Sequence, residues 1–221
     1  MDVEATPAVS SDEVACTRTM IDRVKQRFDI KPHRLVGDTA YGTASLLGWM
    51  FNDKQIEPHV PVWDKSERQD GSLSRSDFTY DPDEDCYRCP TGVLLRTTGQ
   101  ATAEDALLYR ASKFACEGCA FKPMCCPNTP SRKIPRSIHE GARDVARSIG
   151  QTKEYQNSRR HRKKVEMLSA HLKRILKLDH LRLRGLTGAY DEFLLAATIQ
   201  NLRRMAKTLG RTFLQEGTQP A

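Results

Sequence analysis

The sequence predicts an α/β fold that is interrupted by a cysteine-rich β insertion and completed by C-terminal helices. Three observations predict it. Residues 12–62 alternate between helix-like apolar spacing and short apolar runs. Residues 63–135 are rich in Asp, Ser, Pro, Arg and Cys and contain only short alternating apolar pieces. From about residue 138 onward the helical spacing returns.

The first part of the chain reads as helix, strand, helix, strand. Residues 12–29 carry apolar side chains at helical spacing, and residues 33–37 form a short apolar run. Residues 44–55 are again helical in pattern. Residues 56–62 read as a strand whose two prolines favour the edge or end of a sheet.

The last third of the chain is predicted to be helical. We expect helix from about 138 to 178, a turn region at "LRLRGLTGAY", and a second amphipathic helix at 191–209. Residues 210–221, with Gly, Gln and Pro, are expected to form a flexible tail. The predicted inward face of the second helix comprises Leu194, Leu195, Thr198, Ile199, Leu202 and Met205.

The charge of the chain favours a polyanionic partner such as nucleic acid, although many mildly basic proteins bind none. The chain has 35 basic and 28 acidic residues, a net charge of +7. The basic residues concentrate in the C-terminal third, where 159–164 reads "RRHRKK". No apolar run approaches the ~20 residues of a membrane span, and the acidic, polar N-terminus is unlike a signal peptide. We therefore expect a cytoplasmic protein without membrane contact.

Asp38 stands where the apolar run at 33–37 gives way to a glycine-bracketed turn, "GDTAYG". A carboxylate beyond the carboxyl end of a strand lies where α/β sheets collect ligands. The alternative is that Asp38 is a turn residue or a helix N-cap.

A second group of candidate residues lies within "RRHRKKVEMLSAHLKRILK". On a helix, Arg162, Glu166 and Lys173 fall within about 40° of one another. They suit a phosphate site in which Glu166 holds a divalent cation, and the alternative is ordinary surface ion pairing. The expected buried side of this helix, beside Glu166, comprises Val165, Leu168, Leu172, Ile175 and Leu176.

Six of the seven cysteines cluster within the insertion. Two C-x-x-C pairs about 30 residues apart indicate a tetrahedral structural zinc site held by four thiolates. The alternative is a set of scattered buried or free thiols. Cys16 lies on the first predicted helix and is expected to be buried. The candidate ligands are Cys86, Cys89, Cys116, Cys119 and Cys125, with Cys126 adjacent.

Together, "GDTAYG", the C-x-x-C insertion and the R-x₃-E-x₆-K spacing resemble a bacterial insertion-sequence transposase of the DDE type, over roughly residues 2–209. The resemblance implies an incomplete ribonuclease-H-like core at 1–62 and 136–209, with a zinc-ribbon-like insertion at 63–135. It implies that Asp38 is the second catalytic aspartate and Glu166 the catalytic glutamate. The family's Y-x₂-R-x₃-E-x₆-K pattern departs here at its tyrosine, because Arg159 occupies that position and Tyr155 lies one turn earlier.

The resemblance also implies a function, namely metal-dependent cleavage and strand transfer of insertion-sequence DNA. Asp38 and Glu166 would bind Mg²⁺, and Tyr155, Arg159, Arg162 and Lys173 would contact DNA or phosphate. The implied partners are transposon ends, a second copy of the chain or a full-length transposase.

The first catalytic aspartate and the first strands of the core are expected to be missing. Asp2 is expected to be a strand-edge residue and not a replacement for that aspartate, so that the chain resembles a truncated transposase with weakened or no activity. Terminal-repeat DNA cleavage that Asp38→Ala abolishes would refute this expectation. The alternative function is a non-catalytic zinc-ribbon protein that binds nucleic acid or a protein partner.

Overall fold

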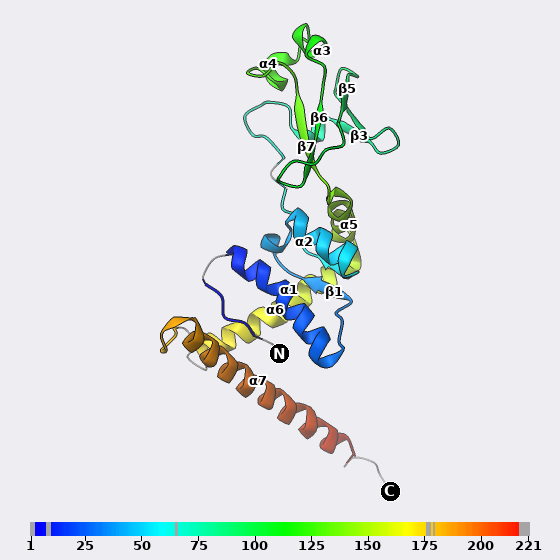
Figure 1. The fold of residues 1–221 in the computed structure, drawn as a ribbon. Helices are drawn as coiled ribbons and strands as arrows, with labels where there is room; N and C mark the ends of the chain where they lie inside the picture. The colour runs from blue at the N-terminus through cyan, green and yellow to red at the C-terminus, as the bar shows by residue number, and fades with distance from the viewer. Residues whose placement is uncertain (1–2, 8–9, 65, 176–177, 179, 217–221) are drawn as a thin grey trace. The chain divides into compact units, whose positions relative to one another are not determined.

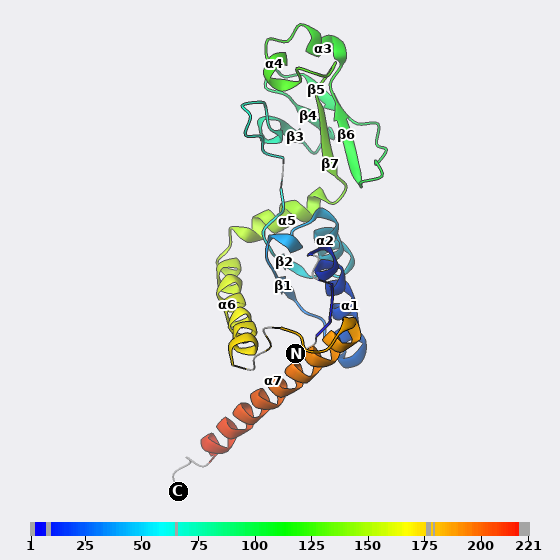
Figure 2. The same ribbon diagram turned by 90° about the vertical axis from the view of Figure 1, so that its left-hand side faces the viewer.

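The protein is described here by a computed structural model that covers residues 3–7, 10–64, 66–175, 178 and 180–216 (Figures 1 and 2). The chain divides into two compact units. The first unit combines Met1–Val36 with Lys153–Ala221, and the second comprises Gly37–Thr152. The predicted α/β class is confirmed, since helices and strands mix along the chain and helices follow the last strand.

The first unit contains helix α1 (Ser10–Phe28), strand β1 (Arg34–Val36) and the long helices α6 (Lys153–Arg174) and α7 (Gly185–Glu216). Arg23 of α1 anchors the segment before it, with its Nη1 2.6 Å from Glu4 Oε2 and its Nη2 donating to the Val3 carbonyl oxygen. Glu192 similarly holds the start of α7, because its carboxylate accepts hydrogen bonds from the amides of Arg182 and Leu183.

Helix α7 differs from its prediction in both extent and buried face. It begins at Gly185, inside the expected turn region, and continues to Glu216 into the expected tail; residues 217–221 lie outside the described part. The predicted inward face is wrong, because Leu195 and Leu202 are 62% and 60% exposed. The buried side of the helix is instead the adjacent stripe, which consists of alanines and one glutamine. That stripe is Ala189, Ala196, Ala197 and Gln200.

The predicted buried side of α6 is also wrong where the structure describes it. Val165 on α6 and Ile175 just beyond it are 61% and 64% exposed, whereas Leu172 is half-buried. The side chain of Leu168, and Leu176 as a whole, lie outside the described residues. Apolar spacing shows that a helix has an apolar stripe, but it does not show that another element of the unit covers that stripe.

The second unit begins with a helical layer. Helix α2 (Ala44–Gly48) continues as a π-helical turn, η2 (Trp49–Asp53), so that the helix predicted at 44–55 is present with a widened end. Strand β2 (Glu57–His59) follows, and helix α5 (Glu140–Gly150) contacts both α2 and β2. The buried side chains of this layer include Leu46, Leu47, Met50, Ile56, Val60, Ala142 and Ala146.

The cysteine-rich region forms a five-stranded antiparallel sheet in chain order, as Figures 1 and 2 show. Its strands are β3 (Thr79–Asp81), β4 (Cys86–Arg88), β5 (Leu94–Arg96), β6 (Ala106–Arg110) and β7 (Lys133–Ser137). The short helices α3 (Lys113–Glu117) and α4 (Lys122–Cys125) lie in the β6–β7 connection. The sheet has its own core of Phe78, Tyr87, Leu95, Tyr109, Ala111 and Ile134.

A buried ionic network lies where this sheet joins α5. Glu140, only 1% exposed, accepts hydrogen bonds from Arg75 in the 3₁₀ turn η3 (Arg75–Asp77) and from Arg143 and Arg147 of α5, at 2.8 to 3.0 Å. Asp64, in the segment after β2, pairs with Arg147 at 2.8 Å and with Arg143 at 3.1 Å. Buried charges are tolerated only when paired in this way. The network therefore fixes the base of the sheet on α5.

Candidate functional site

The turn that carries Asp38 is fixed by two glycines. A Cβ on Gly37 would lie 2.9 Å from the ring of Tyr41, and a Cβ on Gly42 would lie 1.9 Å from the Pro61 carbonyl oxygen. Only glycine fits such close approaches. Asp38 caps the 3₁₀ turn η1 (Thr39–Tyr41), and its Oδ1 accepts a hydrogen bond from the Ala40 amide at 3.0 Å.

The N-cap role that the sequence left open for Asp38 is therefore present in the structure. The residue is nevertheless exposed. The close-packed turn presents its carboxylate at the surface of the second unit, where a cation can reach it.

All the site residues predicted for the C-terminal region lie on one face of α6. Measured from Glu166 at about 100° per residue, Tyr155, Arg159, Arg162 and Lys173 fall within a sector of about 60°. Arg162 Nε lies 3.1 Å from Glu166 Oε1, and the Glu166 side chain is 59% exposed. This is the ordinary surface ion pair that the sequence left open as the alternative, and at this spacing it stabilises a helix by only about 0.3–0.5 kcal/mol.

The two predicted catalytic carboxylates belong to different units. Asp38 lies in the unit formed by Gly37–Thr152, and Glu166 lies on α6 of the other unit. Each is described within its own unit, so that a metal site shared by the two remains a prediction.

A second cationic surface, which the sequence motifs above do not include, lies on another face of α6. A pocket of about 450 Å³ opens between α6 and α7. Arg203 Nη1 lies 2.5 Å from His171 Nε2 across this pocket. The sequence signal was the run "NLRRMAK", whose basic residues follow the spacing of one helical face. The basic lining residues are Lys164, His171, Arg203, Arg204 and Lys207.

The insertion gathers five of its cysteines around one small cavity of about 30 Å³. Two tight turns position three of them. The Gly92 amide donates to the Cys89 carbonyl oxygen, with Gly92 at φ 84°, and the Cys119 amide donates to the Cys116 carbonyl oxygen. Cys125 ends α4 and Cys126 follows it. The five are Cys89, Cys116, Cys119, Cys125 and Cys126.

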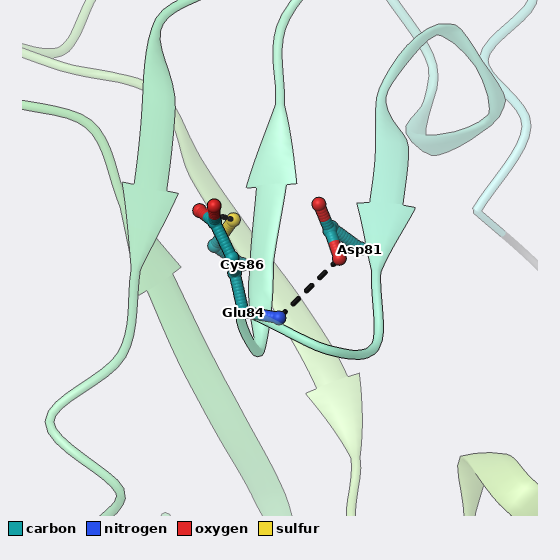
Figure 3. Close-up of side chains that lie close together, drawn as sticks. All are labelled: Asp81, Glu84 and Cys86. Carbon is teal, nitrogen blue, oxygen red and sulfur yellow. Dashed lines mark hydrogen bonds between the residues drawn. The ribbon is translucent and has the colours of Figure 1, made fainter.

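Cys86 does not line this cavity. It lies on β4 beside Tyr87, which faces the core of the sheet, and successive strand residues point to opposite faces. Figure 3 shows Cys86 with Asp81 and Glu84, whose ligand atoms lie within 4.8 Å of one another. Asp81 Oδ1 accepts from the Glu84 amide at 3.3 Å, and the Cys86 thiol lies 3.7 Å from Glu84 Oε2. These contacts close the β3–β4 hairpin.

The carboxylates of the Asp81, Glu84 and Cys86 group already have a cationic partner. Arg88 lies 3.5 Å from Asp81 and 3.5 Å from Glu84, so that a metal ion would have to compete with its guanidinium.

Comparison with known proteins identifies the family. A family profile described as "Transposase DDE domain" matches residues 86–206, more than half of the 221 residues. The chain belongs to this family, which confirms the resemblance seen in the sequence. The match contains Glu166 with Arg162 and Lys173, as well as the cysteine cluster, whereas Asp38 precedes it. Comparisons with curated proteins and with solved structures find no match.

Family membership establishes a transposase-family function, with DNA as the implied partner. Members of this family generally use a divalent metal ion. Within the described part of the chain, no helix is both long enough and apolar enough to cross a membrane.

Proposed function

We propose that this chain acts in metal-dependent cleavage and strand transfer of insertion-sequence DNA. Asp38 and Glu166 serve as two carboxylates of the metal site, and Arg162 and Lys173 bind phosphate oxygens. The site belongs to a ribonuclease-H-like core formed by residues 1–62 and 136–209, with residues 63–135 inserted as a separate module.

The observation that carries this proposal is the face of α6 that bears Arg162, Glu166 and Lys173. It lies inside the family match and places one carboxylate among cations on a single helical stripe. Arg159, Glu166 and Lys173 of this stripe are exposed, so that their charges are accessible to DNA, whereas Tyr155 and Arg162 are half-buried. Guanidinium and ammonium groups suit phosphate oxygens, and a carboxylate among them suits a hard cation.

The donor groups fit Mg²⁺. This ion prefers oxygen ligands, retains several waters and is usually held by one or two carboxylates together with substrate phosphates. Asp38 and Glu166 both offer exposed carboxylate oxygens. When bound, a pair of such ions activates the attacking oxygen and stabilises the leaving one. In this proposal Arg162 and Lys173 bind the DNA backbone, and the two carboxylates position the metal.

DNA also has a second surface to contact. The α6–α7 pocket, with Arg203, Arg204 and Lys207, extends the cationic area of the first unit beyond the catalytic face. Phosphate contacts of this kind position a protein on DNA without reading its sequence.

The test is a cleavage and strand-transfer assay with labelled transposon-end DNA and Mg²⁺. The proposal predicts cleavage by the wild-type chain and loss of cleavage in Asp38→Ala and Glu166→Gln, while both variants still bind DNA. That result would overturn the sequence-based expectation of a truncated transposase with weakened or no activity. Asp12→Asn on α1, which belongs to neither candidate group, serves as the control. DNA binding without any wild-type cleavage would refute catalysis by this chain, agree with the truncated form and leave the DNA-binding function.

A further inference from the structure

We infer that Cys89, Cys116, Cys119 and Cys125 form a zinc site, and that the buried guanidinium of Arg132 supplies its counter-charge. This inference selects four ligands from six candidate cysteines and assigns a role to a residue that no sequence pattern indicated. It does not depend on DNA cleavage, because a closed four-thiolate site is structural.

The arrangement of the backbone supports this ligand set. Cys116 and Cys119 flank one tight turn, Cys89 heads a second, and Cys125 ends α4, so that three separate segments converge on the same cavity. Cys89, Cys116 and Cys125 also pack against the core of the sheet. The cavity volume of about 30 Å³ exceeds the space of one water-sized sphere, so that it can accommodate a single ion.

Arg132 provides the independent observation. It is 7% exposed and lines the same cavity as the cysteines. Its Nη1 donates to the Cys125 carbonyl oxygen at 2.8 Å, and its Nη2 donates to the Leu73 carbonyl oxygen at 2.9 Å. Its Nε is buried without a hydrogen-bond partner among the described residues. Its Cζ also lies 5.0 Å from the centroid of the Phe78 ring.

A buried cation that is bonded only to carbonyl oxygens requires an explanation. Arg132 forms no salt bridge with a carboxylate in the part of the chain that the structure describes, although buried charges are costly unless paired. Four thiolates around Zn²⁺ carry a net charge of −2 and would pair with this guanidinium. The cysteine cluster and the buried guanidinium thus explain each other.

The negative charge that would face Arg132 arises with the metal. A bound Zn²⁺ deprotonates its thiol ligands outright, and this creates the charge with which the guanidinium pairs.

Cys126 and Cys86 serve as the two internal controls. Cys126 also lines the cavity, but it follows the end of α4, whereas Cys125 is the last residue of that helix and packs against the sheet core. Cys86 belongs to the β3–β4 hairpin. We therefore expect neither Cys86→Ser nor Cys126→Ser to remove the metal.

The first experiment measures zinc in the purified full chain by atomic emission. It also records the absorption of the Co²⁺-substituted protein, whose bands report tetrahedral geometry and thiolate ligation. We expect one equivalent of zinc in wild type, Cys86→Ser and Cys126→Ser, and loss of the metal in Cys89→Ser, Cys116→Ser, Cys119→Ser and Cys125→Ser. Absence of zinc and of cobalt bands in the wild type overturns the site. Loss in Cys86→Ser or Cys126→Ser, with retention in Cys125→Ser, overturns the ligand assignment.

The second experiment tests Arg132 by competition for zinc with a chelator of known affinity. We expect Arg132→Met to weaken zinc affinity by about 10- to 100-fold, as removal of groups next to metal ligands typically does, and Arg132→Lys to lose less because it keeps the charge. Arg68→Met, a neighbouring cation outside the cysteine cavity, is the control. Equal zinc affinity in wild type and Arg132→Met overturns the counter-charge role. If Arg132→Met does not fold, a loss of less than tenfold in Arg132→Lys is the expected result, and a tenfold or greater loss there overturns the role of charge.

Discussion

The ionic network around Glu140 allows a quantitative prediction of stability. Substitution of Glu140 by Gln keeps the side-chain shape but removes the charge that Arg75, Arg143 and Arg147 share at 2.8 to 3.0 Å. Because Glu140 is only 1% exposed, water cannot replace its carboxylate as the hydrogen-bond acceptor for the three arginines. Breaking a buried pair from one side costs about 3–5 kcal/mol, which corresponds to a fall in melting temperature of about 6–20 °C for a chain of this size.

Thermal unfolding followed by circular dichroism measures this effect, and Asp144→Asn is the matched control. Asp144 contacts the same Arg147 from the same helix, but its side chain is 57% exposed. Exposed pairs contribute about 0–1 kcal/mol, so that this control should lower the melting temperature by only a few degrees. Equal effects of Glu140→Gln and Asp144→Asn would refute the conclusion that burial makes the Glu140 charge essential.

Three further predictions concern pH, the Asp38 turn and DNA. Burial opposes ionisation of Glu140, but hydrogen bonding from Arg75 and the arginine charges prevail and lower its pKa below the ordinary 4.5. The stabilisation is therefore complete above pH 4.5 and is lost as the pH falls toward the lowered pKa, and melting curves should show a flatter acid dependence in Glu140→Gln. Gly42→Ala should destabilise the protein by about 1–3 kcal/mol in denaturant unfolding, whereas Gly141→Ala, with no atom within 4 Å of the added Cβ, should not. Arg162→Ala and Arg203→Ala should each reduce the slope of log affinity for DNA against log salt concentration by about 1, the value expected for one phosphate contact. An unchanged slope in both variants would contradict their proposed contacts.

Local features of the site could be predicted from the sequence because they depend on neighbouring residues. "GDTAYG" indicates a turn, and the two close approaches at Gly37 and Gly42 give the physical reason for its glycines. The stripe from Tyr155 to Lys173 follows from helical periodicity alone once the segment is helical. In both cases the signal lies within a few turns of chain.

Features that depend on what packs against an element could not be predicted in this way. The apolar residues of α7 gave a clear stripe, yet Ala196 and Ala197 are buried and Leu195 is exposed. Likewise, spacing alone could not rank Cys86 against Cys125 as metal ligands. The difference arises from strand alternation at β4 and from the convergence of three segments on one cavity. Arg132 was missed because nothing in its local sequence shows that it becomes buried.

The two ends of the cysteine-rich sheet differ in what holds them. At its base, Glu140 and Asp64 connect the sheet to α5 through the arginine network. At its far end, where α3 and α4 lie in Figures 1 and 2, these short helices bury none of their own residues. The zinc site inferred above would supply there the stabilisation that a small core lacks. Chelation of the metal should therefore loosen α3 and α4, detected as faster amide hydrogen exchange at 113–126, while exchange in α5 stays unchanged because its own contacts hold the base.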